Sequence, residues 1–221
     1  MDNEQHREFP SGLRILIVDD HAMLRECLSR IVAKKYPEAV LGQAADASQA
    51  LAQLEKHPWQ VVLLDIFMPG RSGLDILKEI KLLQPETRIV VFSGHPEDHY
   101  ALRVLKAGAA GYLNKEKAST EVIAAITKVM SGGRYVSANL TDTLVAALEK
   151  PVAIALHDTL SGREYQIMRM IAAGKSVKEI SSDLKLSGKT ISTYRTRLLV
   201  KLNLQSNAEI MRYALRENLI E

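Results

Sequence analysis

The chain has a single cysteine, Cys27, among its 221 residues. An intramolecular disulfide is therefore excluded, and such sparse use of cysteine is typical of a reducing compartment. The apolar spacing around Cys27 predicts that its side chain packs in the core. No window approaches the roughly 18 consecutive apolar residues of a membrane-spanning helix, and residues 1–12 lack the apolar stretch of a secretory signal. These absences predict a cytoplasmic protein without a membrane partner.

Acidic residues become scarce toward the end of the chain. Residues 1–132 carry 16 Lys/Arg and 17 Asp/Glu, whereas residues 157–221 carry 11 Lys/Arg and seven Asp/Glu. Between Leu184 and Ala208 there is no acidic residue at all. That stretch contains five basic residues: Lys185, Lys189, Arg195, Arg197 and Lys201. Such a field suits a polyanion such as nucleic acid, although a solvated basic face has the same composition.

Four apolar runs in the first half each stop at a polar residue. The runs are Arg14–Asp20, Val61–Asp65, Arg88–Ser93 and Gly111–Lys115. Because they do not alternate with polar residues, they predict strands buried on both faces, as in a parallel sheet covered by helices. The first domain is therefore expected to be a doubly wound α/β fold.

The residues that end these runs predict a binding site. They are Asp19, Asp20, Asp65, Ser93 and Lys115. In such sheets functional groups gather at the carboxyl ends of the strands. Carboxylates are ligands for Mg²⁺, and a carboxylate such as Asp65 can also form an aspartyl phosphate. Lys115 supplies a point charge for phosphate, and the Ser93 hydroxyl can donate a hydrogen bond to a phosphoryl oxygen.

Each of these residues also has an alternative interpretation on its own. Asp19 or Asp20 can serve only as a helix N-cap, Ser93 can be a turn residue, and Lys115 can simply be solvated. Their joint position at the ends of four runs favours a site for a divalent cation and a phosphoryl group.

Signals for the start and end of helices organise the second half. A helix over residues 120–131 is expected to stop at Gly132 and Gly133. Residues 134–156 are expected to form a linker that is partly helical, because apolar residues recur with helical spacing from Leu140 to Lys150. Three capping boxes then follow, at Ser161–Glu164, Ser176–Glu179 and Ser206–Glu209. Together with Ser187 as a further N-cap, they predict four helices over residues 161–173, 176–185, 188–202 and 206–217.

The second and third of these helices predict a helix-turn-helix, because only Leu186 and Ser187 separate them. In that motif the second helix enters the major groove. Its apolar residues should pack inward, while Lys189, Ser192, Thr193, Thr196 and Arg197 lie broadly on the opposite face. Such side chains can contact bases or phosphates. An amphipathic core helix with a solvated basic back is the alternative.

Four segments of the first half carry a family resemblance: IVDDH (17–21), LLDIFMPGRSGLD (63–75), VVFSGH (90–95) and AGAAGYLNK (107–115). With them the first half resembles the receiver domain of two-component response regulators. The resemblance implies a flavodoxin-like, five-stranded parallel sheet. It implies Asp65 as phosphoacceptor and a Mg²⁺ site formed by Asp19, Asp20, Asp65 and the backbone carbonyl of Phe67. It also implies a phosphate switch formed by Ser93, Tyr112 and Lys115.

The last part of the chain resembles the LuxR-type helix-turn-helix, a small all-α domain of four helices. The resemblance implies base reading by Ser192, Thr193 and Thr196, and contacts to the DNA backbone by Lys189, Tyr194, Arg195 and Arg197. In this family the last helix often forms the dimer contact on DNA, and residues 206–217 correspond to that helix here. Its candidates are Ala208, Met211, Tyr213 and Leu215, for which core packing is the alternative.

Joined, the two resemblances imply a NarL/FixJ-type response regulator. The expected organisation is a tail (1–12), a receiver (13–133), the linker (134–156) and a DNA-binding domain (157–221). A sensor histidine kinase would phosphorylate Asp65 with Mg²⁺ bound. The added charge would then draw Ser93 and Lys115 inward, with Tyr112 following. The basic domain would be freed or a homodimer favoured, and double-stranded DNA bound.

Two other functions remain as alternatives. One is a DNA-binding regulator whose receiver-like domain works without phosphorylation. The other is an aspartyl-phosphate hydrolase of the haloacid dehalogenase type, which needs a carboxylate two residues after the nucleophile. Phe67 occupies that position and cannot transfer a proton, so no enzyme is expected. Phe67 and His95 also occupy the positions where the receiver family tunes phosphate lifetime, and a bulky Phe67 predicts slow loss of phosphate.

Overall fold

The computed structural model describes residues 12–68, 71–94, 97–137 and 155–220, with the side chains of residues 97–99 left out. The expected tail up to residue 11, the expected helix over residues 140–150 and His95 lie outside the described residues. The expected domain boundaries stay predictions. No helix among the described residues is long and apolar enough to span a bilayer.

Strands and helices alternate regularly in the first part of the chain. The elements there are β1 (Arg14–Val18), α1 (Ala22–Lys35), β2 (Val40–Ala44), α2 (Ala47–Lys56), β3 (Val61–Asp65), α3 (Gly73–Leu83), β4 (Arg88–Ser93), α4 (Glu97–Lys106), β5 (Gly111–Asn114), a 3₁₀ turn η1 (Lys115–Lys117) and α5 (Ala118–Met130). The second part contains a 3₁₀ turn η2 (Leu156–Thr159), α7 (Gly162–Ala172), α8 (Val177–Leu184), α9 (Gly188–Leu202) and α10 (Asn207–Arg216). We call these parts the sheet domain (residues 12–137) and the helical domain (residues 155–220).

The five strands are all parallel, in the order β2-β1-β3-β4-β5. This confirms the predicted doubly wound sheet. The apolar runs revealed β1, β3, β4 and β5 but not β2, whose sequence VLGQA is mostly exposed or half-buried. As an edge strand, β2 needs no continuous apolar run, so no such signal marks it.

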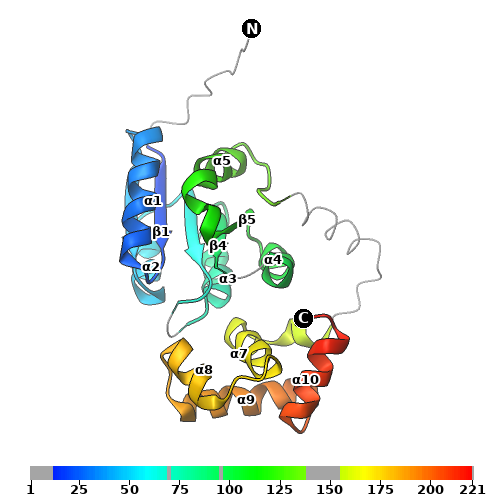
Figure 1. The fold of residues 1–221 in the computed structure, drawn as a ribbon. Coiled ribbons are helices and arrows are strands. Elements are labelled where there is room, and N and C mark those ends of the chain that lie inside the picture. The colour runs from blue at the N-terminus through cyan, green and yellow to red at the C-terminus, as the bar shows by residue number, and fades with distance from the viewer. Residues whose placement is uncertain (1–11, 69–70, 95–96, 138–154, 221) are drawn as a thin grey trace.

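Helices cover both faces of the sheet (Figure 1). Helices α1 and α5 pack with alternate strand residues such as Ile15 and Ile17 in one apolar core. Helices α2, α3 and α4 pack on the other face with Leu16 and Val18. This second core continues into the helical domain through residues such as Tyr165. Of the two apolar cores, the one on the face of α2, α3 and α4 therefore crosses the domain boundary.

The helical domain confirms the predicted helices, each with a serine at its N-cap. Ser161 and Ser176 form complete capping boxes with Glu164 and Glu179. The third box is different: Ser206 accepts from the Glu209 N–H, but the Glu209 carboxylate accepts from the backbone of Gln205. The N-terminus of α10 is still satisfied, one residue earlier than the motif predicts.

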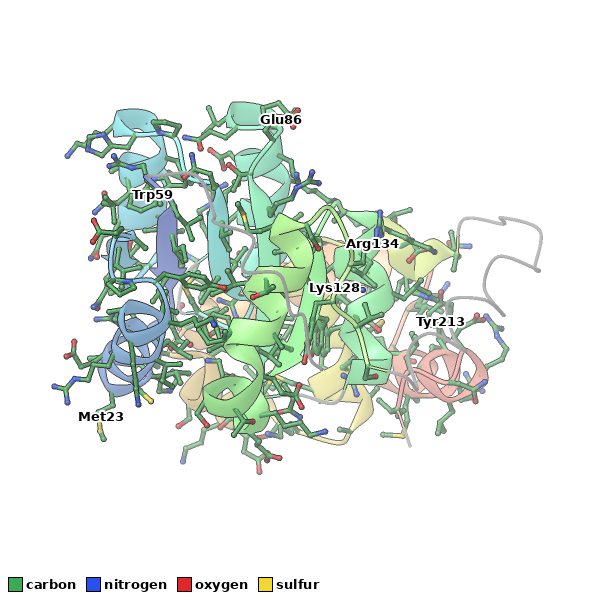
Figure 2. The ribbon with its side chains drawn as sticks, turned by 90° about the horizontal axis from the view of Figure 1, so that it is seen from above. Met23, Trp59, Glu86, Lys128, Arg134 and Tyr213 are labelled. Atoms are coloured by element: carbon green, nitrogen blue, oxygen red, sulfur yellow. The ribbon has the colours of Figure 1, made fainter. Side chains whose placement is uncertain are left out.

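Cys27 is exposed, which contradicts the predicted core position. The buried side of α1 consists of Leu28 and Val32, and Cys27 lies outside that stripe. It shares an open apolar surface with Met23, which points outward from α1 in Figure 2 and is 88% exposed. Helical spacing near the boundary of a stripe leaves the face of a single residue undecided.

Candidate functional site

Three carboxylates gather at the carboxyl edge of the sheet. Asp19 and Asp20 follow β1, and Asp65 ends β3, the neighbouring strand. Asp19 and Asp65 are fully buried, and the Asp20 side chain is 16% exposed. One side-chain oxygen from each carboxylate and one ring nitrogen of His21 all lie within 4.8 Å of one another. The oxygen-rich set brings together what the sequence predicted.

These oxygens fit a hard divalent cation. Asp20 Oδ1 is buried and accepts no hydrogen bond, although His21 Nδ1 lies 2.9 Å away, so the contact is close but poorly directed. An unsatisfied buried carboxylate oxygen is costly, and Mg²⁺ is commonly bound through one or two carboxylates. The donor set therefore suits Mg²⁺.

Lys115 joins the carboxylates. Its Nζ lies 2.6 Å from Asp19 Oδ2 and donates to Asp65 Oδ2 at 2.8 Å. Burial alone would lower the pKa of Lys115, but the carboxylates of Asp65 and Asp19 outweigh it and raise that pKa. Burial, and next the Asp19 charge, raise the pKa of Asp65 against the opposing effect of Lys115. The ammonium lies where it can later contact a group attached to Asp65.

The isolated alternatives for these residues are wrong. The N-cap of α1 is His21, so neither Asp19 nor Asp20 caps that helix. Lys115 has a side chain only 18% exposed, and Ser93 is a buried strand residue. Tertiary packing turns each of them toward the same edge.

The chain after Asp65 folds back on it. The Phe67 N–H donates to Asp65 Oδ1 at 2.9 Å, and the Gly73 N–H donates to the carbonyl of Ile66 at 3.2 Å. A Cβ atom at Gly73 would overlap the Asp65 carbonyl oxygen, so the start of α3 approaches closely only because of glycine. The role of the Phe67 carbonyl as a metal ligand stays a prediction.

Ser93 and Tyr112 lie on adjacent strands and are both buried, at 0% and 1% exposure. The sequence predicted that phosphorylation would draw Ser93 inward with Tyr112 following. Both side chains already lie inside in this structure, and their response to phosphorylation stays a prediction.

The predicted DNA-reading surface is open to solvent. Lys189, Ser192, Thr193, Thr196 and Arg197 are exposed on α9. The hydroxyls of the three Ser/Thr residues donate to backbone carbonyls four residues earlier in the chain. Their oxygens keep lone pairs free to accept, which suits the amino groups of adenine or cytosine.

The other two predicted contacts are partly structural. Tyr194 is half-buried against the core. Arg195 is half-buried and its Nε donates to Asn207 Oδ1 at 2.6 Å, tying α9 to α10. Each retains a role at the DNA backbone only as a prediction.

The candidate dimer positions separate into two groups. Ala208, Met211 and Leu215 are exposed on α10. Tyr213 is 6% exposed, and its hydroxyl accepts from the backbone of His157 at 3.1 Å. Tyr213 therefore packs within the helical domain and is no surface residue, because it lies on the face of α10 that includes Ile210 and Ala214.

Sequence reasoning missed the contacts between the two domains. Arg163 of α7 is 2% exposed and donates to the carbonyl of Met68 at 2.6 Å and to Gln166 Oε1 at 2.5 Å. Met68 belongs to the segment that follows Asp65. An arginine in the first turn of a helix gives no sequence signal for burial, and its partner is a backbone carbonyl 95 positions away.

Aromatic rings continue this interface. Phe67 packs edge-to-face on Tyr100 of α4, with ring centroids 4.8 Å apart, and Tyr100 packs edge-to-face on Tyr165 of α7 at 5.5 Å. The Arg169 guanidinium lies 5.2 Å from the Tyr100 ring. Burial raises the pKa of Tyr100 to about 12. A line of contacts thus runs from the backbone beside Asp65 to the helical domain.

Arg103 of α4 is a second anchor between the domains. Its guanidinium donates to the carbonyls of His157, at 2.7 Å, and Leu160. It also lies 4.4 Å from the Tyr165 ring. Beside it, the Gly162 N–H donates to the Asp75 carboxylate at 3.3 Å. The helical domain is thus docked across α3, α4 and the carboxyl edge of the sheet (Figure 1).

Within the helical domain, Glu164 predicts a pH dependence. Its carboxylate is buried and accepts from Lys201 at 2.6 Å and from the Ser161 N–H at 2.8 Å. Burial alone would raise the pKa, but these bonds hold it below its ordinary value of 4.5. A carboxyl with a depressed folded-state pKa stabilises above its unfolded pKa, and this contribution disappears as pH falls through the folded value.

We therefore expect amide-exchange protection of α7 and α9 to fall as pH drops below about 4.5. In Glu164→Gln, protection should be lower at neutral pH and less dependent on pH. The control is Glu179→Gln, which removes an exposed capping-box glutamate of the next helix. Equal pH profiles for the wild type and Glu164→Gln would contradict this.

Comparisons with known proteins agree on both domains. Residues 15–127 match the family described as response regulator receiver domain, and residues 158–214 match bacterial regulatory proteins, luxR family. The chain is 36% identical over 209 residues to response regulator GacA of Pseudomonas protegens, covering 95% of this chain and 98% of that protein. It is 36% identical over 208 residues to response regulator UvrY of Escherichia coli K12, covering 94% and 95%.

A solved structure shares the arrangement of elements. RcsB from Salmonella enterica serovar Typhimurium, bound to promoter rprA in the presence of the phosphomimetic BeF₃⁻, aligns with a TM-score of 0.57 and 23% identity. The alignment covers 91% of this chain and 98% of that one. At this identity the likeness shows the fold alone.

Proposed function

Because this chain belongs to the NarL/FixJ-type response regulators, transcription factors that join a receiver to a LuxR-type DNA-binding domain, we propose that phosphorylation of Asp65 controls its binding to DNA. The sheet domain is the receiver and the helical domain the DNA-binding domain. Beyond this family membership, the roles of individual residues, the bound Mg²⁺ and the partners are proposed below. The observation that carries the proposal is the contact of Lys115 with the buried carboxylates of Asp19 and Asp65, in a chain that also has an exposed recognition helix.

The side chains divide the work of phosphoryl transfer. Asp65 offers Oδ2 as the nucleophile, while the Phe67 N–H holds Oδ1 and so fixes the orientation of the carboxylate. Lys115 contacts Asp65 Oδ2 and can follow the new phosphoryl oxygens with its charge. Ser93 supplies a hydroxyl from the next strand. Mg²⁺, held by Asp19, Asp20, Asp65 and the Phe67 carbonyl, would neutralise charge on the transferred group.

The donor of the phosphoryl group is proposed to be a sensor histidine kinase. Hydrolysis as a main activity is not supported, because the Phe67 ring packs on Tyr100 and has no proton to transfer. The chain is proposed to act as a switch, without turnover of a small-molecule substrate. Slow loss of phosphate, with Phe67 hindering water, stays a prediction.

The effector step is proposed to depend on arrangement rather than on unmasking. The exposed residues of α9 and the exposed Met211 and Leu215 of α10 are not covered by the sheet domain. Phosphorylation therefore need not uncover a recognition helix. It is proposed to favour a homodimer that places two helices on half-sites of double-stranded DNA, about 34 Å apart or a multiple of that. Because it is proposed to act on DNA, the protein is also proposed to be cytoplasmic.

The function is tested by selection from a random-sequence DNA pool. The full chain is incubated with and without Mg²⁺ plus beryllium fluoride, which mimics an aspartyl phosphate. We expect a two-fold symmetric site enriched with the mimic. Equal enrichment in both states would support the alternative of a phosphorylation-independent regulator. A lack of enrichment in both states would contradict the DNA-binding function itself.

The α9 side chains should divide into base readers and phosphate contacts. Thr193→Ala should weaken binding at one base position by about 1–3 kcal/mol and relax the preference there. Lys189→Ala should weaken binding to all sequences and reduce the salt slope by about one. Val200→Ala, at an exposed position of the same helix, is the control. Affinities for a matched set of duplexes at several salt concentrations decide between the roles.

A uniform loss in Thr193→Ala, with no change in base preference, would contradict its role as a reader. An unchanged salt slope in Lys189→Ala would contradict a phosphate contact.

A further inference from the structure

A lysine of the helical domain reaches the acidic edge of the sheet domain, by which we mean the carboxyl edge with Asp19, Asp20 and Asp65. Lys185 lies in the turn between α8 and α9, and its Nζ is 3.8 Å from Asp20 Oδ2. Asp20 is one of the proposed Mg²⁺ ligands. The Lys185 side chain is 71% exposed and that of Asp20 is 16% exposed, so the ammonium approaches a mostly buried carboxylate from the solvent side.

The backbone of the turn positions this lysine. Lys185 has φ 52°, in the left-handed region, and its N–H donates to the carbonyl of Ser182 at 3.3 Å. The following Leu186 N–H donates to the carbonyl of Ser181 at 3.0 Å. The turn is therefore fixed relative to α8, and Lys185 projects from the rim of the domain.

The docking of the helical domain keeps Lys185 beside Asp20. The buried bond from Arg163 to the carbonyl of Met68 and the bond from Gly162 to Asp75 join α7 to the sheet domain. Both contacts lie in the segment from β3 into α3, close to the acidic edge. Undocking would carry Lys185 away from Asp20, because both belong to rigid elements of different domains.

The acidic edge needs more positive charge than it holds. Asp19 and Asp65 contact Lys115, and the His21 imidazole lies 2.9 Å from both Asp19 and Asp20. Among the described residues, Lys185 is the other ammonium in contact with this cluster. A dication bound through Asp20 would repel that ammonium and take over its carboxylate. The two cations therefore compete for one ligand.

We propose that Lys185 competes with Mg²⁺ for Asp20, so that metal binding and docking of the helical domain oppose each other. The proposal rests on the proposed function, since it uses the same metal site. It makes the helical domain a determinant of the metal affinity of the sheet domain. Coupling between two binding events is reciprocal, so Mg²⁺ also weakens docking.

A DNA phosphate would compete with Asp20 for the Lys185 ammonium. This lysine belongs to the acid-free stretch from Leu184 to Ala208, and only Leu186 and Ser187 separate it from the recognition helix. A DNA phosphate that pairs with Lys185 removes it from Asp20. DNA binding and Mg²⁺ binding then support each other before any phosphoryl group is added.

The test is calorimetric titration of MgCl₂ into the full chain at low ionic strength, without DNA or a phosphoryl analogue. Lys185→Gln should bind Mg²⁺ about two- to fivefold more tightly than the wild type, the effect expected for one solvent-exposed ion pair. Lys178→Gln, an exposed lysine on α8, makes the same change in net charge away from Asp20. It should leave the Mg²⁺ affinity unchanged.

A second variant reaches the same end without changing Lys185. Arg163→Met removes the buried contact to the sheet domain and should tighten Mg²⁺ by a similar factor. The double variant Lys185→Gln/Arg163→Met should show no further gain, because both changes remove the same competitor. An additive gain would assign the effect of undocking to another contact and overturn the proposed link between docking and the competition by Lys185.

The outcomes separate this inference from the proposed function. Lack of Mg²⁺ binding by the wild type would overturn the proposed metal site itself. Binding by the wild type with equal or weaker binding by Lys185→Gln would overturn the competition and leave the metal site standing. Tighter binding by both lysine variants would reveal an effect of net charge alone, and this too would overturn the proposal.

Discussion

Asp65→Asn should abolish both phosphoryl labelling and the DNA response to Mg²⁺ with beryllium fluoride. The amide cannot form an acyl phosphate under these conditions, and it carries no charge to hold Mg²⁺. Asp65 Oδ2 accepts from Lys115 and Oδ1 from Phe67, so an amide of the same shape can satisfy only one of these two donors. The ratio of DNA affinities with and without the mimic should fall to about one.

Labelling with a small phosphodonor, resolved by a phosphate-retarding gel, and DNA titrations measure the two effects. Glu38→Gln is the control, since Glu38 is an exposed carboxylate outside the acidic edge. Asp65→Asn should remain folded, because it removes a buried charge that burial and Asp19 oppose. A variant that is still labelled would place the phosphoacceptor elsewhere. A variant that loses the label but binds DNA with the same affinity as the wild type would support phosphorylation-independent control.

Arg163→Ala should separate the two domains in the resting protein. The variant leaves the buried carbonyl of Met68 without this donor, and an unsatisfied buried group costs about 1–3 kcal/mol. It also removes a large buried side chain from the junction. A cost of this size reduces the docked population relative to the undocked one by about 5- to 150-fold.

Small-angle scattering of the full chain should show a larger radius of gyration, and the segment after Asp65 should exchange its amides faster. Arg212→Ala, a 76%-exposed arginine of α10, is the control. Arg163→Lys, which can still donate to one carbonyl, should restore part of the compactness. If Arg163→Ala stays as compact as the wild type, the contacts of Arg103 and the aromatic rings are enough to hold the domains, and Arg163 is not the anchor.

The parts predictable from sequence are those with local signals. Apolar runs indicated the buried strands, and a serine followed three residues later by a glutamate indicated the start of a helix. The residues of the acidic edge were predictable because parallel strands must present their ends together. Edge strand β2 was missed because it is half-exposed, and the side chain of Cys27 was misplaced because a small error in helical phase changes the face. For Tyr213, the alternative of core packing holds.

The contacts between domains had no such signal. The partners of Arg163 and Arg103 across the junction are backbone carbonyls, which every residue carries, so the residue types of the partners say nothing. Lys185 belongs to a basic stretch of the sequence, but its distance from Asp20 depends on how the two domains dock. Such distances follow from tertiary structure alone.

Gly162 sets a limit on how freely the two halves of this regulator can be exchanged. A Cβ atom there would overlap Ser72 Oγ and come within 3.0 Å of Leu74, so the first turn of α7 accepts only hydrogen where it meets α3. A chimera that joins this receiver to another LuxR-type domain carries a complete phosphorylation site and a complete recognition helix. If its α7 begins with a larger residue, the halves no longer fit, and the chimera inherits both activities without the connection between them.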